Sequence, residues 1–492
     1  MLPETSIPWF AYLVTAFYVG LTYFLSVKGM RRTKSLAGFS IGNGDMSPVL
    51  VGLTMASSIA STATFVINPG FVYTHGLSAF LHYGVAASGG IIAALLLLCH
   101  GFRRTGARYK ALTIPHWIRE HYGSRGLALF FALINLLSIT FVVLILVGCA
   151  ILTAQLFDIS RQAALIAVLL FVFSYVLMGG TYAHAYTNSF QAVLMLFIAV
   201  ALFVSGLGYF NGDFFGSLAA VSPQFAAPLN AESTLYYDFW SVFASGFIVT
   251  FALMMQPHIL TKVLYLKNDR DVKWFLVTAI GAGLIFSLML FTGFYARLSG
   301  LEVGSQDAVV AHYIAAEMEG IVGGTFFLTI ITIALLAAGM STLDGILVSL
   351  SAMVVNDLYF PFSKAADKER LGLHLSRLVL VVIGLVAFAL AWQPPALVGL
   401  FAQKGVYGLA AASVVPIVFG VLMRRPVSAW IAASAAVCGL TVHLALHLGF
   451  GVANPSVSAS YAILASFCLG FVCLGLDRPA EVGATVTAAE PQ

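Results

Sequence analysis

Two clusters of hydroxyl side chains lie inside long uncharged stretches of this chain. The first occupies residues 57–64, where five of eight side chains are Ser or Thr, and the second is Ser341-Thr342. Hydrocarbon cannot solvate a hydroxyl, so each must bond to backbone, to another side chain or to something that moves through the protein. Two such clusters on separate helices could hold a small dehydrated cation through oxygen atoms.

The spacing supports this interpretation, although a plainer one stays open. On a helix, Ser57, Ser61 and Thr64 are separated by four and three residues and therefore share one face. Serine and threonine in membrane helices also bond to their own backbone or to a neighbouring helix without binding any ion. No His or Cys is placed with either cluster, which disfavours a transition metal.

Composition places these clusters in a membrane. Of 492 residues, 60% are apolar and 9% are charged, against ~25% charged in an ordinary soluble domain. The chain is therefore predicted to be an all-α membrane protein. A net charge of +4 indicates no nucleic-acid partner. No catalytic motif or Gly-rich phosphate loop is present, so we expect no enzyme and no organic cofactor. The expected partners are a small-molecule solute and the lipid bilayer, with no obligatory protein partner.

Apolar stretches predict thirteen membrane-spanning helices, each long enough to cross ~30 Å of hydrocarbon. Their approximate limits are 8–27, 46–68, 77–99, 126–156, 162–179, 189–210, 237–256, 274–298, 321–356, 373–392, 397–423, 427–448 and 457–475. With the N-terminus outside, all Lys and Arg except Arg161, Arg297 and Lys404 fall in cytoplasmic connections. This bias predicts a plasma (inner) membrane protein with a cytoplasmic C-terminus. One transporter domain spans 1–476, and 477–492 is expected to be a disordered cytoplasmic tail.

Four motifs in order along the chain resemble the sodium:solute symporter family, whose members include proline, pantothenate and monocarboxylate permeases and sodium–glucose transporters. The motifs are Phe65-Val66-Ile67-Asn68-Pro69-Gly70, Gln256-Pro257-His258-Ile259 followed by Lys262 and Asp269, Ala338-Gly339-Met340-Ser341-Thr342-Leu343-Asp344, and Gly408-Leu409-Ala410-Ala411 with Pro416 and Gly420. The resemblance implies the five-plus-five inverted repeat of the leucine-type sodium symporters.

The repeats would occupy 46–210 and 237–423, with an extra N-terminal helix at 8–27 and two C-terminal helices at 427–475. Transporters of this kind have broken helices in corresponding halves. We expect one break at the first hydroxyl cluster and the other near Ser245-Gly246.

The resemblance further implies sodium-coupled symport of a small organic solute by alternating access. Carried over residue by residue, it places sodium ligands at the carbonyls of Ser57, Ala60 and Ala338 and at the hydroxyls of Ser341 and Thr342. An alignment shifted by one residue would move the first two carbonyls to Ala56 and Ile59. No other metal is expected.

The substrate is expected near the midplane, beside the broken helices. Candidate contacts are Ser61, Thr62, Thr64, Trp240, Ser245, Gln403 and Lys404. Lys404 is the basic residue placed well inside a predicted span, and it mildly favours a small carboxylate or amino acid over a sugar. The alternative is that its side chain extends outward to the headgroups.

Two further residues are expected to matter for coupling. Asp344 lies one helical turn after Ser341, and an acid at that depth indicates a functional site or a buried structural partner. Asn188 stands where many sodium-coupled relatives carry an acid, so we expect a single coupling ion. His184 could titrate in the physiological range, which leaves proton coupling open, although a structural histidine facing a loop is the plainer interpretation. Two further functions stay open, a transporter-like membrane sensor and a passive channel.

Overall fold

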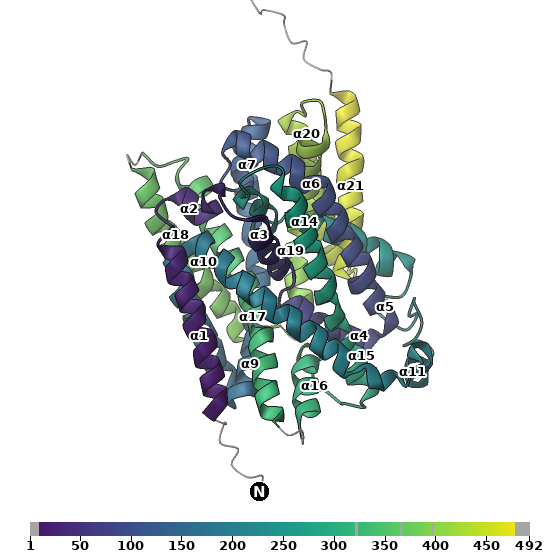
Figure 1. Ribbon diagram of the computed structural model, residues 1–492. Coiled ribbons are helices and arrows are strands. Elements are labelled where there is room, and N and C mark those ends of the chain that lie inside the picture. Colours follow the sequence, from purple (N-terminus) through teal and green to yellow (C-terminus); the bar gives the residue numbers. More distant parts are fainter. Residues whose placement is uncertain (1–8, 320–322, 365–366, 396, 478–492) are drawn as a thin grey trace, which may run out of the picture.

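The computed structural model describes residues 9–319, 323–364, 367–395 and 397–477, and in these residues the chain folds into a helical bundle (Figure 1). The only pairing of extended backbone in this part of the chain is a single bridge between Met46 and Leu266. The expected all-α fold is therefore confirmed. The tail predicted at 477–492 lies outside the described residues except for Asp477.

The helices follow one another through short connections. In chain order they are α1 (Trp9–Met30), α2 (Leu36–Ile41), α3 (Pro48–Ile59), α4 (Asn68–His75), α5 (Leu77–Phe80), α6 (Ala87–Tyr109), α7 (Ile114–Tyr122), α8 (Arg125–Asn135), α9 (Ile139–Phe157), α10 (Arg161–Ser205), α11 (Phe214–Val221), α12 (Ser245–Leu253), α13 (Pro257–Leu260), α14 (Asp271–Phe286), α15 (Phe291–Leu298), α16 (Val309–Met318), α17 (Gly324–Met353), α18 (Lys368–Trp392), α19 (Val398–Leu422), α20 (Ala429–Leu444) and α21 (Pro455–Leu476). Short π- or 3-10-helical turns extend several of them, including η2 (Ala63–Ile67), η6 (Trp240–Ala244) and η7 (Thr261–Tyr265).

Within the described residues, ten helices are long and apolar enough to cross a membrane, and two bent pairs raise the number to twelve. The first pair joins α3 to η2 and α4 with a bend of 52°, and the second joins η6 and α12 to α13 and η7 with a bend of 64°. Both predicted broken helices are present. The first break lies at the hydroxyl cluster as expected. The second lies between Leu253 and Pro257, not near Ser245-Gly246.

The longest helix, α10, is divided by one glycine. Its 45 residues would extend ~68 Å at 1.5 Å per residue, about twice the thickness of the hydrocarbon core. Gly180 has φ +50° and ψ −140°, a conformation open only to glycine. A Cβ at this position would lie 2.5 Å from the Phe39 ring. Thirteen spans, the number that the sequence predicts, would require the two halves of α10 to cross separately, and this number stays a prediction.

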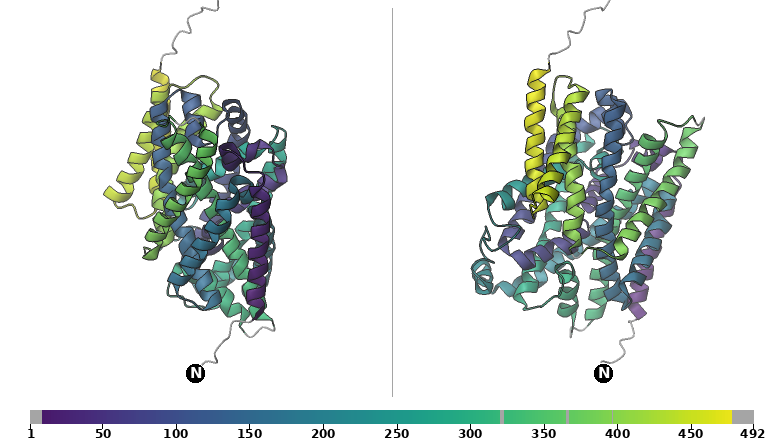
Figure 2. Two further views of the ribbon diagram at one scale, coloured as in Figure 1. Left: turned by 90° about the vertical axis from the view of Figure 1, so that its left-hand side faces the viewer. Right: turned by 180° about the vertical axis from the view of Figure 1, so that it is seen from behind.

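The ends of the bundle differ in the connections they carry. Figure 1 shows α2 and α7, which belong to basic connections, at one end, and α11 and α16 at the other. The start of α1 and the end of α21 lie at opposite ends, and the rotated views in Figure 2 agree. Ends that lie on opposite sides fit an odd number of crossings, and which side faces the cytoplasm stays a prediction.

The first break follows from local backbone chemistry. Helix α3 begins after Ser47, whose side chain accepts a hydrogen bond from the Leu50 N–H, and Pro48 occupies its first position. It ends at Ala60, where φ −83° and ψ 69° leave the helical region. Helical turns resume at Thr62, and the Ser61 hydroxyl accepts a hydrogen bond from the Ala63 N–H at 3.1 Å. A hydroxyl-rich sequence thus supplies its own helix cap in mid-membrane.

Candidate functional site

The two hydroxyl clusters meet in the core, where α3 crosses α17. The Ser341 hydroxyl lies 2.9 Å from the Ser57 carbonyl oxygen and 2.9 Å from that of Ala338. The Thr342 hydroxyl donates to the Ser58 carbonyl at 3.1 Å and lies 3.5 Å from that of Ser57. All five residues are buried. Carbonyl and hydroxyl oxygens of two helices therefore converge in a region closed to water.

Ala60, the remaining predicted sodium ligand, lies at the break rather than in this hydrogen-bonded cluster. Its N–H completes α3 by donating to the Ala56 carbonyl at 2.9 Å, and the residue lines a neighbouring cavity. The Thr342 hydroxyl donates to the carbonyl oxygen of Ser58 and not to that of Ala60. Sodium binding by the carbonyls of Ser57 and Ala60 thus stays a prediction for both residues.

A third element joins this cluster through Asn188 in the second half of α10. The amide nitrogen of Asn188 donates to the Ser341 carbonyl at 2.6 Å and lies 3.4 Å from the Ser58 hydroxyl. Its amide oxygen is buried and has no hydrogen-bond partner within the described part of the chain. Asn188 therefore ties together the two helices that carry the predicted ligands and presents an uncommitted oxygen beside them.

Asp344 lies one turn further along α17 and is completely buried. Its Oδ1 is 2.8 Å from His184 Nδ1, and its Oδ2 accepts a hydrogen bond from the Tyr175 hydroxyl at 3.4 Å. His184 is 3% exposed, so the expectation of a loop-facing histidine is wrong. His184 lies about one helical turn after Gly180 in α10, and its imidazole packs against α17 at Gly345.

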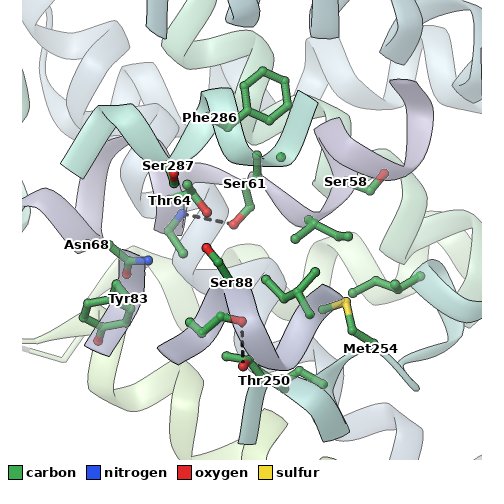
Figure 3. A pocket seen from close by; sticks show the side chains of 18 of the residues that line it. Ser58, Ser61, Thr64, Asn68, Tyr83, Ser88, Thr250, Met254, Phe286 and Ser287 are labelled. Carbon is green, nitrogen blue, oxygen red and sulfur yellow. Dashed lines mark hydrogen bonds between the residues drawn. The ribbon is translucent and has the colours of Figure 1, made fainter. Parts of the chain in front are cut away.

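A cavity of about 180 Å³ opens beside the break in the first broken helix (Figure 3). It is lined by residues of both broken helices and of α6, α14 and α19. Its polar side chains are Ser58, Ser61, Thr64, Asn68, Tyr83, Ser88, Thr250, Gln256, His258, Ser287, Gln403 and Tyr407. None of its described lining residues is Asp, Glu, Lys or Arg. Pockets for drug-sized ligands are typically ~300–1,000 Å³, so this cavity suits a small molecule.

Three of the predicted substrate residues line this cavity: Ser61, Thr64 and Gln403. In Figure 3 the hydroxyls of Ser61 and Thr64 face the same space as that of Ser88. The sequence prediction does not include Ser88, although a hydroxyl within an uncharged span is the same kind of signal that singles out residues 57–64. It also omits Asn68, Thr250 and Ser287, since each is a single polar residue in an apolar stretch.

Thr62, Trp240 and Ser245 do not line the cavity. Thr62 points toward α9, where its hydroxyl is 3.9 Å from the Cys149 sulfur. Trp240 donates from its indole nitrogen to the Ser460 hydroxyl at 3.0 Å and stacks on Tyr461 of α21. The Ser245 hydroxyl returns to the Ser241 carbonyl of its own helix at 2.9 Å.

Lys404 also lies away from the cavity. It is exposed on α19 and belongs to a separate, largely apolar recess with His443 and His447 of the α20 region. The expectation that its ammonium faces a substrate in the central cavity is corrected by this placement. The neighbouring residue Gln403 faces the cavity instead, because successive residues on a helix point about 100° apart.

Aromatic side chains close one end of the cavity. The Tyr83 hydroxyl accepts hydrogen bonds from the Tyr236 hydroxyl at 2.9 Å and from Gln403 Nε2 at 3.3 Å. Phe71 packs against both tyrosine rings, with centroid distances of 5.6 Å and 6.3 Å. This cap joins α4, the π-helical turn Leu81–Ala86 before α6, the segment before η6 and α19 through side-chain contacts.

Comparison with known proteins decides the family. The profile of the sodium:solute symporter family matches residues 39–439. The chain belongs to the sodium:solute symporter family. Two curated relatives are sodium/pantothenate symporters. That of Haemophilus influenzae is 26% identical over 462 residues, which cover 91% of each chain. That of Escherichia coli is 25% identical over 488 residues, which cover 95% of this chain and 96% of the relative.

Solved structures support the fold of this symporter. An outward-open, substrate-bound Na⁺-coupled sialic acid symporter has a TM-score of 0.77 and 18% identity, covering 96% of this chain and 99% of that structure. A nucleobase-cation-symport-1 family transporter in a closed conformation has a TM-score of 0.55 and 13% identity, covering 89% and 94%. The protein is thus a membrane transporter rather than an enzyme, and sodium-coupled symport of a small solute is its supported activity.

Proposed function

We propose that this symporter uses the sodium gradient to import a small carboxylate that also carries hydroxyl or amide groups, with pantothenate as the first compound to test. The observation that carries the proposal is the position of Ser58. Its carbonyl accepts the Thr342 hydroxyl in the α3–α17 cluster, while the residue also lines the central cavity. Ser58 therefore lies between the hydroxyl cluster that we propose to hold sodium and the cavity that we propose to hold the solute.

The ion site consists of oxygen atoms only. In the proposal, sodium binds the carbonyls of Ser57, Ala60 and Ala338 and the hydroxyls of Ser341 and Thr342. Hard cations take oxygen ligands, and a group of neutral oxygens leaves the charge of a monovalent ion uncancelled. That residual positive charge lies next to the cavity, where it favours an anionic solute over a cationic one.

The solute site holds its ligand through neutral groups. The helix that resumes at Thr62 directs its N-terminal end, with its partial positive charge, toward the break. Broken helices in transporters of this type direct such ends at substrate carboxylates. Ser61, Thr64, Asn68 and Gln403 add donors and acceptors for hydroxyl and amide groups, and the apolar remainder accommodates methyl groups. The names of the two curated relatives agree with this solute class.

The finer transport cycle belongs to the same proposal. The N-terminus lies outside and the C-terminus in the cytoplasm of the plasma membrane. The inverted repeats at 46–210 and 237–423 move by alternating access, and the aromatic cap over the cavity opens toward the outside. Sodium stabilises the contact between α3 and α17, which keeps the solute site in shape for binding.

Uptake by proteoliposomes tests the proposal. Radiolabelled pantothenate should accumulate above equilibrium when external sodium exceeds internal sodium, and not when potassium replaces sodium at fixed pH and voltage. Unlabelled carboxylates, amino acids and sugars added in excess identify the solute class by competition. Accumulation driven by a pH gradient without sodium would establish proton coupling instead. Solute binding with no accumulation under any gradient would identify a sensor.

A further inference from the structure

Next to the ion site lies a buried group of ionisable side chains that the proposed sodium and solute sites do not use. It consists of Asp344 on α17, His184 on α10 and Lys262 on the segment that follows the second break. His258, on the same segment as Lys262, also lines the central cavity. Lys262 is 0% exposed, as is Asp344. A buried lysine is costly at any depth in a membrane protein and calls for a partner.

Geometry directs the Lys262 ammonium toward α17. Its Nζ donates to the carbonyl oxygen of His258 on its own segment, and an ammonium has two further donors. A Cβ built on Gly345 would lie 3.5 Å from Lys262 Nζ and 3.3 Å from His184 Nε2. Both nitrogens therefore rest against the backbone of α17 at the residue that follows Asp344.

His184 connects the two charges. Its Nδ1 lies 2.8 Å from Asp344, while its Nε2 is buried, without a partner among the described residues, and faces the same side of Gly345 as the ammonium. Tyr175 completes the contacts of the carboxylate. Tyr175 supplies a hydrogen bond but no net charge, and His184 adds a charge only when it is protonated. Among the described Lys and Arg side chains, Lys262 is the only one with zero exposure, and its Nζ lies against Gly345, the residue that follows Asp344.

The same place is suited to a cation. Asp344 follows Ser341 by three residues, which places both side chains on one face of α17. The uncommitted oxygen of Asn188 is held beside the Ser341 carbonyl. A carboxylate, a carbonyl and an amide oxygen on two packed helices would attract a second hard cation if no positive charge stood there.

We propose that Lys262 is a built-in counter-cation for Asp344, which replaces a second coupling ion beside α17 and sets the coupling at one sodium per solute. This inference rests on the proposed sodium-driven transport and adds its stoichiometry. Because the ammonium is part of the chain, it stays with Asp344 through the cycle, whereas a bound ion would be carried across. It also ties the segment after the second break to the ion-site helix.

The test measures sodium stoichiometry in single and double variants. Double-label uptake of radioactive sodium and solute should give a flux ratio of one in the native protein. Lys262→Met leaves Asp344 uncompensated, so the Hill coefficient for sodium and the flux ratio should rise toward two. Asp344→Asn leaves the ammonium unmatched beside the ion site, so half-saturation by sodium should rise roughly tenfold or more. The double variant Lys262→Met/Asp344→Asn removes both charges and should return both values close to native.

Controls separate charge from packing. Lys267→Met makes the same change at an exposed lysine five residues away and should leave the flux ratio at one. Lys262→Arg keeps the charge and should keep the ratio even where the larger head slows transport. If a single variant is inactive, thermal stabilisation by sodium over potassium in detergent replaces uptake as the readout, and recovery in the double variant supports the proposal.

Three results would overturn it: a native flux ratio of two, additive effects of the two substitutions without recovery, or a native sodium response in both single variants. Each differs from failure of the proposed function, in which native uptake shows no sodium dependence at all. The stabilisation assay needs sodium alone, so it decides the inference even if pantothenate is not the solute.

Discussion

Replacing Ser341 by alanine should weaken sodium binding strongly while leaving the fold intact. The Ser341 hydroxyl lies at the centre of the α3–α17 cluster, 2.9 Å from both the Ser57 and the Ala338 carbonyl oxygens. The substitution removes one oxygen and adds no atom, so it creates no clash and only a very small cavity. Its effect should therefore fall on the ion and not on packing.

The magnitude follows from the kind of ligand that the substitution removes. A hydrogen bond or short polar contact to a charged partner contributes about 1.5–3 kcal/mol. One of five oxygen ligands is removed, so half-saturation by sodium should rise by a factor of about 10 to 150 at 25 °C, since 1.4 kcal/mol corresponds to tenfold. The loss of neutral hydrogen bonds should cost the fold only about 1 kcal/mol.

Ser351→Ala provides the matched control. Ser351 lies on the same helix, is 0% exposed, and donates to the carbonyl three residues earlier at 2.9 Å, as Ser341 does. The Ser351 hydrogen bond stays within α17, whereas the Ser341 hydroxyl also reaches the Ser57 carbonyl on α3. Sodium-dependent uptake and sodium-induced thermal stabilisation should be native in Ser351→Ala and shifted in Ser341→Ala. Equal sodium responses in the two variants would refute the assignment of the α17 hydroxyls as ligands.

Three further outcomes are expected. Lys404→Met should change the Michaelis constants for solute and sodium by less than about twofold, a free-energy difference of ~0.4 kcal/mol, because Lys404 lies outside the cavity; a larger effect in uptake assays would return it to the solute site. Gly180→Ala should lower the yield of folded protein in size-exclusion profiles, since a side chain in this glycine-only backbone conformation costs about 1–3 kcal/mol and the added methyl meets Phe39. Gly281→Ala, which meets nothing within 4 Å, should not lower the yield. Burial raises the pKa of Asp307, so its ionised form is disfavoured in the folded protein and stability falls as pH rises through the usual carboxyl pKa of ~4. The amide oxygen of Asp307→Asn can still accept from the Val398 N–H, so this variant should melt higher than the native protein at pH 7.5 and should lose that advantage below about pH 4. Equal melting temperatures of the two proteins at both pH values would contradict this prediction.

The sequence predicts the helical fold and the two hydroxyl clusters that meet in the core, because both depend on local chemistry in an apolar medium. Uncharged stretches predict the membrane-spanning helices, and hydroxyls within them indicate polar contacts because lipid cannot solvate them. The predicted position of the second break is wrong, since it treats Gly246 as a helix breaker. A Cβ at Gly246 would lie 3.0 Å from both the His82 ring and Ala86, so this glycine serves close packing. The break falls at Gln256, whose backbone is extended before Pro257, as the residue before a proline generally prefers.

The parts of the site that the sequence does not reveal depend on interactions between distant segments. Asp344 stands out by its depth, but its neighbours His184 and Lys262 come from two other elements that the fold brings together. For Lys404, the predicted span gives its position along the helix, yet that position does not say which face of the helix the side chain takes. One rotation of about 100° separates the cavity-facing Gln403 from its exposed neighbour.

Trp240 connects the second broken helix to α21, so the two helices cannot move independently while its contacts hold. It begins the second broken helix, yet its ring is stacked on Tyr461 and hydrogen-bonded to Ser460 in α21. Just before it in the chain, the Leu235 carbonyl accepts the Asn454 amide. Any displacement of this helix must break these interactions or carry α21 with it. Helix α21 is then mechanically coupled to the second broken helix. A thick bilayer, a tightly bound lipid or a bulky fusion that holds α21 in place would therefore slow transport without contacting the ion or the solute.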